Sequence, residues 1–145
     1  MHNQGNHDWL VMKFGGTSVS SASCWDTICQ QARAHLEQGR KVMIVVSALS
    51  GVTNLLTRLA EGAEDAERAE IIAELRSKHF DFYTALGLEP SPEFMNHWGN
   101  LERLLEPDSQ SASPRIRAEI LAHGELLSSN LGLQILSANG LTAAW

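Results

Sequence analysis

The segment Lys13 to Ser18 (KFGGTS) combines residue types that could bind a polyphosphate. Its glycine pair, Gly15 and Gly16, lets the backbone approach a ligand without Cβ hindrance, and successive N–H groups there can form an anion-binding nest. Lys13 adds a cation, and Thr17 and Ser18 add hydroxyl donors. An ordinary glycine turn beside a solvated lysine fits these residues equally well. Neither the Rossmann fingerprint nor the P-loop spacing is present.

A second polar loop, Ser47 to Asn54 (SALSGVTN), follows an apolar run and precedes a predicted helix. Ser50 or Thr53 can simply be the N-cap of that helix. Hydroxyl groups at the start of a helix can also bind carboxylate or phosphate. Both interpretations remain open from this loop alone.

The third feature is His123-Gly124-Glu125, inside a predicted helix. A glycine there costs about 1 kcal/mol relative to alanine, which predicts close approach of another backbone or of a ligand. Glu125 is either a solvated surface charge or an acceptor for an ammonium group. The six histidines, His123 included, are interpreted as surface or packing residues, because none forms an i, i+4 pair typical of a metal site.

The elements that must position these residues follow from the hydrophobic pattern. Apolar runs at 9–14 and 41–46 predict two buried strands. Helical spacing over 25–36, with Ser21 or Ser23 as N-cap, predicts the helix that joins them. Because such parallel units cross right-handed, both polar loops should face one cleft at the same edge of the sheet.

The rest of the chain is predicted to be mostly helical. Helices are expected at 53–61, 66–86, 91–105 and 115–138, a loop at 106–114, and a third strand at 141–145. The predicted fold class is α/β, a three-layer αβα arrangement with a mostly parallel sheet and a helical insertion at about 66–105. Three strands are fewer than the five or six of a typical sheet, which indicates a truncated domain. Residues 1–8 are expected to be a flexible lead, and 9–145 the N-terminal part of one domain.

The composition limits the classes of partner. A chain of 145 residues, 43% hydrophobic and 19% charged, fits one soluble globular domain. Its net charge of -6 argues against binding to nucleic acid or to an anionic membrane. Cys24 and Cys29 match neither redox nor zinc spacings, so we expect reduced thiols in a cytoplasmic protein. No signal sequence, membrane span or metal site is predicted.

Three motifs in this order resemble the aspartate kinase family: Lys13 to Val19 (KFGGTSV), Val45 to Leu56 (VVSALSGVTNLL) and His123 to Ser128 (HGELLS). The resemblance covers nearly all of this chain and about half of the family's kinase domain. It implies an amino-acid-kinase fold and MgATP-dependent phosphorylation of the L-aspartate β-carboxylate to 4-phospho-L-aspartate, the first step of lysine, threonine and methionine biosynthesis. A homo-oligomeric enzyme is also implied. Trp25 to Ile28 and the polar lead are similar to members fused to a diaminopimelate decarboxylase.

The same resemblance implies roles for individual residues. Lys13 is the catalytic residue that contacts the transferring phosphoryl group. The phosphates of ATP are bound by Lys13, Gly15, Gly16, Thr17, Ser18 and Ser47, and the aspartate substrate by Thr53 and Glu125. Because a β-carboxylate is already ionised at pH 7, the reaction needs no general base. Catalysis then depends on in-line positioning and on neutralising charge, in which Mg²⁺ takes part.

Two alternatives remain. One is a related kinase acting on glutamate, acetylglutamate, carbamate or a nucleotide, although such relatives typically lack the complete KFGGTS string together with SGVTN. The other is a non-catalytic fragment that binds phosphate or a partner. On this view the 145 residues alone lack kinase activity, because the adenosine pocket and the distal charged residues of the family lie outside them.

Overall fold

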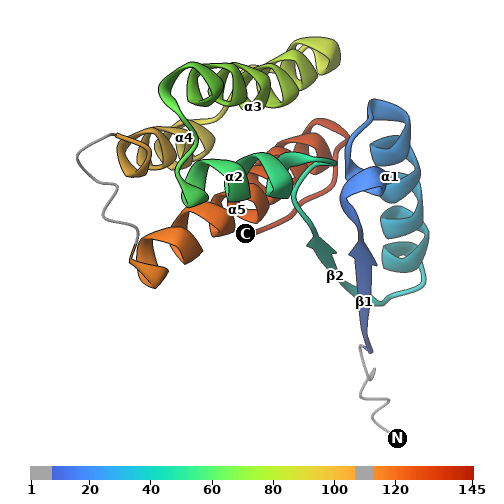
Figure 1. Ribbon diagram of the computed structural model, residues 1–145. Coiled ribbons are helices and arrows are strands. Elements are labelled where there is room, and N and C mark those ends of the chain that lie inside the picture. Colours follow the sequence, from blue (N-terminus) through green and yellow to red (C-terminus); the bar gives the residue numbers. More distant parts are fainter. Residues whose placement is uncertain (1–7, 107–112) are drawn as a thin grey trace, which may run out of the picture.

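The computed structural model describes residues 8–106 and 113–145 (Figure 1). The elements are β1 (Trp9–Phe14), the 3₁₀ turn η1 (Gly16–Val19), α1 (Ala22–Glu37), β2 (Lys41–Val46), α2 (Val52–Glu61), α3 (Asp65–Leu86), α4 (Pro92–Leu104) and α5 (Pro114–Ala138). Most of the predicted N-terminal lead and of the predicted loop at 106–114 lies outside the described residues.

β1 and β2 form a parallel pair, and α1 connects them (Figure 1). The register runs from Trp9 opposite Lys41 to Phe14 opposite Val46. Beyond the strands, Ser47 N donates to Phe14 O at 3.1 Å. The segments that follow β1 and β2 therefore begin side by side. The predicted strands, their parallel direction and the α/β class are confirmed.

The N-cap of α1 is Ser21, one of the two predicted serines. Its side chain accepts a hydrogen bond from Cys24 N at 3.3 Å and so satisfies one of the amides that the first turn leaves unpaired. Gly39 follows the end of the helix with φ of 77°, a conformation that glycine adopts without strain. The same helix buries Trp25, whose indole supports the loop after β1.

The two faces of the sheet differ. Side chains alternate along each strand, so one face packs against the hydrophobic core formed with α1, α2 and α5. The opposite face exposes Trp9, Val11, Met43 and Val45, by 62%, 59%, 48% and 41%. Such a row of large apolar side chains is typical of a sheet face that another layer covers.

α3 and α4, which correspond to the predicted helical segment at 66–105, pack together through an aromatic cluster. Tyr83 and Phe94 lie edge to face with ring centroids 4.9 Å apart. Gln134 of α5 holds this pair of helices in place, because its Oε1 accepts from Tyr83 Oη at 2.6 Å and from Ser91 N at 3.0 Å. That these helices are an insertion in the domain stays a prediction.

Two predictions are wrong. Residues 141–145 do not pair as a third strand. Instead, Leu141 N donates to Leu136 O at 3.0 Å as part of the helix C-terminus, and Trp145 Nε1 donates to Ser129 Oγ at 2.8 Å, so this tail folds back along α5 (Figure 1). The interpretation of Ser50 or Thr53 as the N-cap of α2, one of the two that the sequence left open, is also wrong: Gly51 is the N-cap and makes no side-chain bond.

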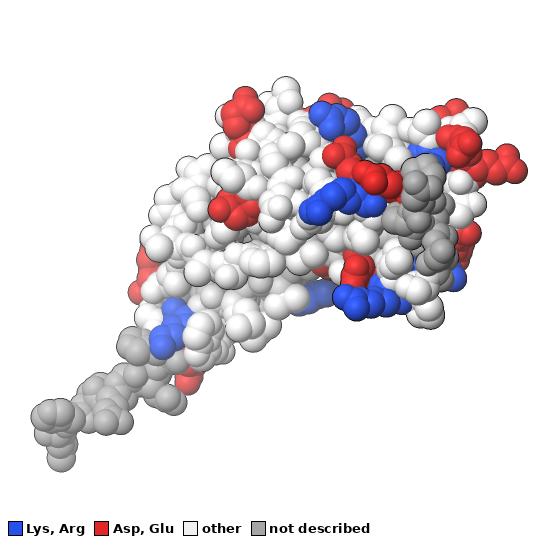
Figure 2. All heavy atoms as spheres, turned by 90° about the vertical axis from the view of Figure 1, so that its left-hand side faces the viewer, with Lys and Arg blue, Asp and Glu red and all other residues white. Residues whose placement is uncertain are grey.

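The charged side chains on one face of the molecule are of both signs (Figure 2). On the face shown in Figure 2, Lys and Arg are interspersed with Asp and Glu and do not merge into one basic patch. No helix of the described residues has the length and apolar character needed to cross a membrane.

Acid should weaken this fold through His79, which is fully buried among the α3 and α4 aromatic rings. Its Nδ1 donates to Leu75 O at 2.8 Å, and its buried Nε2 has no partner among the described residues. Burial lowers the pKa of His79 below its ordinary value of about 6.5. Below pH 6.5 the unfolded chain therefore binds more protons than the folded chain, and the free energy of unfolding should fall by up to about 1.4 kcal/mol per pH unit for this group.

Urea unfolding of the wild type and of His79→Leu, each at pH 7.5 and 5.5, checks this prediction. The loss on acidification should be smaller in the variant. His35→Gln is the matched control and should lose as much as the wild type. An equal loss in all three proteins would contradict the role of His79.

Candidate active site

The loops after β1 and β2 are in direct contact. A Cβ placed on Gly16 would lie 2.8 Å from Ala48 O and 3.4 Å from Ser50 N, so the backbone of the second loop leaves no room for a side chain. Neither glycine of the pair has a positive φ, and Gly15 has φ of -80°. Gly16 is therefore required for close packing of two loops of the protein itself. The expectation that both loops lie at the same edge of the sheet is confirmed, and that they face one cleft stays a prediction.

The first loop contains the turn η1, whose last residue is hydrogen-bonded to a buried side chain of α1. Ser18 N donates to Gly15 O at 3.0 Å and makes the first bond of the turn, so the amides of Gly16 and Thr17 precede it. Trp25 Nε1 donates to Val19 O at 2.9 Å, and both side chains are buried. The indole thus fixes the end of η1, while the Thr17 and Ser18 side chains stay exposed.

Lys13 lies at the start of this loop, on the exposed face of the sheet. Its Nζ is 3.9 Å from the position that a Cβ on Gly15 would take. The ammonium group therefore lies near the Gly15 backbone, and Thr17 and Ser18, which follow this glycine pair in the chain, are exposed. A cation next to unhindered amides is an arrangement that suits phosphate oxygens.

The second loop is anchored at several points. Ser47 N is bound to Phe14 O, and Val52 N donates to Leu49 O at 3.0 Å. Gly51, with φ of 82°, starts α2. Thr53 follows in the first turn of that helix, and its side chain is exposed.

α5 brings the third motif against the second loop. A Cβ on Gly124 would lie 2.8 Å from Ala48 Cβ and 3.3 Å from Leu56 Cδ1. A close approach at this glycine is confirmed, but the neighbours are side chains of the second loop and α2 and not the predicted backbone or ligand. Because Gly124 lets α5 come so near, the next residue, Glu125, reaches the loop: its Oε1 accepts from Ala48 N at 3.2 Å.

The Glu125 carboxylate therefore has two surroundings at once. One oxygen is bound to the Ala48 amide, and the side chain as a whole remains exposed to solvent. A carboxylate has room for about four hydrogen bonds, so the group can still accept from an ammonium ligand. Its neighbour His123 is buried, with Nδ1 bound to Glu119 O at 2.7 Å, and burial lowers its pKa. His123 is thus a packing residue, as predicted.

The structure brings some of the predicted residues together and leaves others apart. Gly16, Ser47 and Glu125 meet around Ala48, whereas the side chains of Thr17, Ser18 and Thr53 point to solvent. Within 8–106 and 113–145, no three His, Cys, Asp or Glu side chains are grouped as metal ligands. Sequence reasoning missed Ser20, which bonds to both loops, since one serine among several in a polar turn carries no signal.

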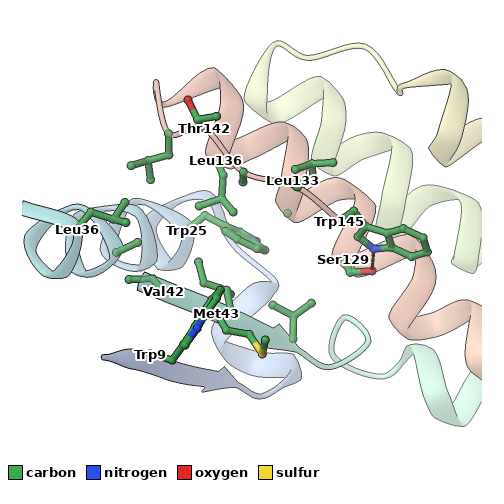
Figure 3. A pocket seen from close by; sticks show the side chains of 17 residues that line it. Trp9, Trp25, Leu36, Val42, Met43, Ser129, Leu133, Leu136, Thr142 and Trp145 are labelled. Carbon is green, nitrogen blue, oxygen red and sulfur yellow. Dashed lines mark hydrogen bonds between the residues drawn. The ribbon is translucent and has the colours of Figure 1, made fainter. Parts of the chain in front are cut away.

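A mainly apolar hollow of the described surface lies away from these loops (Figure 3). It has a volume of about 390 Å³ between β2, α1, α5 and the C-terminal tail. Its lining is mainly apolar, with Trp25, Leu136 and Trp145 among the contributors. None of the predicted site residues lines it, so we place the chemistry at the loop contact and not in this hollow.

Comparison with known proteins identifies the relatives of this chain. The model of the amino acid kinase family matches residues 8–145. Lysine-sensitive aspartokinase 3 of Escherichia coli K12 is 34% identical over 138 residues, which cover 94% of this chain and 30% of the relative. The aspartokinase of Chlamydia trachomatis is 36% identical over 129 residues, covering 84% of this chain and 26% of the relative.

A solved structure is similar as well. Aspartokinase III of E. coli in complex with aspartate and ADP superposes with a TM-score of 0.79 at 31% identity, over 95% of this chain and 30% of that one. This chain thus spans less than a third of the length of these relatives. The family match over 138 residues and the shared fold lead to one conclusion: the chain belongs to the amino acid kinase family.

Proposed function

We propose that this chain is part of an aspartate kinase, which transfers the γ-phosphoryl group of MgATP to the β-carboxylate of L-aspartate. The observation that carries the proposal is the convergence of the three motif-bearing segments, in which Gly16 and Glu125 both contact Ala48. These segments are 77 residues apart in sequence at the Glu125 bond. The similar E. coli enzyme was solved with aspartate and ADP, which supports the choice of ligands.

The first loop would bind the phosphates of ATP, whereas other residues would bind aspartate. Lys13 and the amides near Gly15 and Gly16 would bind the phosphates and neutralise the charge that develops during transfer. Ser47 and the exposed Thr17 and Ser18 would add hydroxyl donors on the same side. No proton has to be removed from the attacking carboxylate, so a histidine has no role as a general base.

The substrate would be held on the second loop and α5. Thr53, exposed on the first turn of α2, would bind a carboxylate of aspartate, because helix N-termini favour anions. Glu125 would receive the α-ammonium group with the oxygen capacity that the Ala48 bond leaves unused.

Mg²⁺ fits this donor set only as a companion of ATP. The described residues offer no carboxylate cage, and Mg²⁺ commonly binds through substrate phosphates and water with few protein ligands. When bound, the ion would neutralise phosphate charge. The chain's own contribution is to place Lys13 and the loop amides around the phosphate oxygens.

A substrate panel on the full-length gene product tests the proposal. ADP release with MgATP should be fastest with L-aspartate and much slower with glutamate, acetylglutamate or carbamate, since Glu125 and Thr53 would fit one length of amino-acid side chain. Replacing aspartate by succinate, which lacks the ammonium group, should abolish most of the turnover. Faster turnover of glutamate than of aspartate would contradict the proposal and favour the related kinase.

Three accompanying predictions belong to the same proposal: a cytoplasmic location, a homo-oligomeric enzyme, and a decarboxylase fused to the kinase. An E. coli relative named bifunctional aspartokinase/homoserine dehydrogenase 2 is 29% identical over 138 residues, so kinases of this type are found fused to other enzymes.

A further inference from the structure

Ser20 connects the two loops of the candidate site through one hydroxyl group. Its Oγ donates to Gly16 O at 2.5 Å and accepts from Ser50 N at 2.8 Å. Gly16 belongs to the phosphate loop, which is the first loop, between β1 and α1, and is predicted to bind phosphate. Ser50 belongs to the second loop and lies 30 residues after Ser20 in the chain. A hydroxyl can donate one hydrogen bond and accept others, so a single serine satisfies both groups.

The bond to Ser50 differs in kind from the bond to Gly16. A serine bound to a carbonyl four residues earlier is a local contact that many turns contain. The Ser50 contact is long-range, and it supplements the backbone bond from Ser47 N to Phe14 O, where the two loops begin. Ser20 therefore adds a second link between the loops, and Gly16 packs against Ala48 O of the second loop as well.

Solvent has access to this contact. Ser50 is exposed and, with Ser20, lines a polar pocket against Ser77 and Lys78 of α3. Without the Ser20 hydroxyl, water can accept the hydrogen bond of the Ser50 amide, so the loss in folding free energy is small. What is lost is the fixed separation of the loops.

We infer that Ser20 is a positioning residue that holds the phosphate loop and the second loop in register. The catalytic consequence rests on the proposed function. In-line phosphoryl transfer needs the γ-phosphate and the attacking carboxylate to be aligned, and each loop would hold one of them. The two hydrogen bonds of the Ser20 hydroxyl thus form a clamp between the loops. Loss of this clamp lowers kcat more than it weakens the binding of either substrate.

Hydrogen exchange of the Ser50 amide shows whether this amide is protected by its bond to Ser20, independently of any enzymatic reaction. In the full-length gene product, hydrogen–deuterium exchange of the peptide containing Ser50 should be about 3- to 10-fold faster in Ser20→Ala than in the wild type, as expected for loss of one exposed hydrogen bond. Ser20→Thr keeps the hydroxyl and should remain protected. Ser23→Ala, which removes an exposed hydroxyl bonded to Ser21 Oγ rather than to the Ser50 amide, is the matched control and should exchange like the wild type.

Steady-state kinetics measure the catalytic consequence. Ser20→Ala should lower kcat by about 10-fold while KM for aspartate and for ATP stays within about twofold. Ser20→Cys, which keeps the shape but hydrogen-bonds weakly, should resemble Ser20→Ala, and Ser20→Thr should restore most of kcat.

Each contrary result has a distinct meaning. Unchanged exchange at Ser50 in Ser20→Ala would overturn the clamp itself. Faster exchange with unchanged kcat, or equal loss in Ser20→Thr and Ser20→Ala, would overturn its positioning role. If the unmodified protein failed to turn over aspartate, the proposed function and its kinetic consequence would fall, while the exchange result would still decide whether Ser20 holds the loops.

Discussion

Replacing Lys13 by alanine should lower kcat for aspartate-dependent ADP release about 10²- to 10³-fold, the loss expected when one preorganised donor to a developing charge is removed. Lys13 Nζ lies beside the Gly15 backbone, where the γ-phosphate would be bound. KM for aspartate should change little, because the substrate would bind through Thr53 and Glu125. Lys13→Arg keeps the charge but not the compact ammonium, so we expect a partial loss.

Lys41 provides a matched control for Lys13. Both lysines lie on the exposed face of the sheet, but Lys41 begins β2, where it pairs with Trp9 and places its ammonium 5.6 Å from that ring. Lys41→Ala removes the same charge at the opposite end of the strands and should leave kcat within about twofold, since screening weakens its influence over that distance. Coupled ADP-release assays of both variants compare them. A Lys13→Ala enzyme with wild-type kcat would contradict the phosphoryl-contact role.

Replacing Gly132 by alanine should destabilise the protein by about 1–3 kcal/mol, the usual cost of overpacking, even though alanine favours a helix. A Cβ on Gly132 would lie 2.4 Å from Trp25 Cη2 and 3.0 Å from Cζ2. The indole cannot move aside freely, because its Nε1 is bound to Val19 O in the core. Any shift of the ring therefore disturbs the end of η1 as well as the contact between α1 and α5.

Gly99 offers the opposite case on α4. A Cβ on Gly99 would meet no atom within 4 Å. Gly99→Ala should therefore stabilise the protein by about 0.5–1 kcal/mol through helix propensity alone. Urea unfolding followed by far-UV circular dichroism measures both variants. A Gly132→Ala midpoint at or above that of the wild type would show that the Trp25 side is less tightly packed than the geometry indicates.

Local structure followed closely from the sequence wherever one pattern was decisive. Lys41 to Val46 is a continuous β-branched run, and its strand bounds were predicted to the residue. The helix ends were also near the prediction, because Ser21, Ser91 and Ser113 cap their helices with their own side chains. These features depend on neighbours in the chain, so short-range chemistry determines them.

The failures concern partners distant in the chain. Residues 141–145 have a strand-like composition, but a strand exists only when another strand supplies its hydrogen bonds, and here the tail binds α5 instead. In α2 the N-cap is Gly51, and the residue before it, Ser50, donates its amide to Ser20 in the other loop. No periodicity in the sequence shows either choice.

The candidate site divides along the same line. The sequence alone proposed Lys13, the glycine pair, the Ser47 to Asn54 loop and Glu125 as the candidate site, because their residue types and their order resemble the aspartate kinase family. It also showed that Gly124 needs a close neighbour, since glycine within a helix is costly.

Only the tertiary structure decided which groups touch. It placed Gly16 against Ala48, turned one oxygen of Glu125 toward the Ala48 amide and put the Ser20 hydroxyl between the two loops. These contacts join segments up to 77 residues apart and arise from the packing of α5 and α1 against the sheet. Residue types and their spacing can therefore name the chemistry, whereas the alignment of the reacting groups is a property of the packed core.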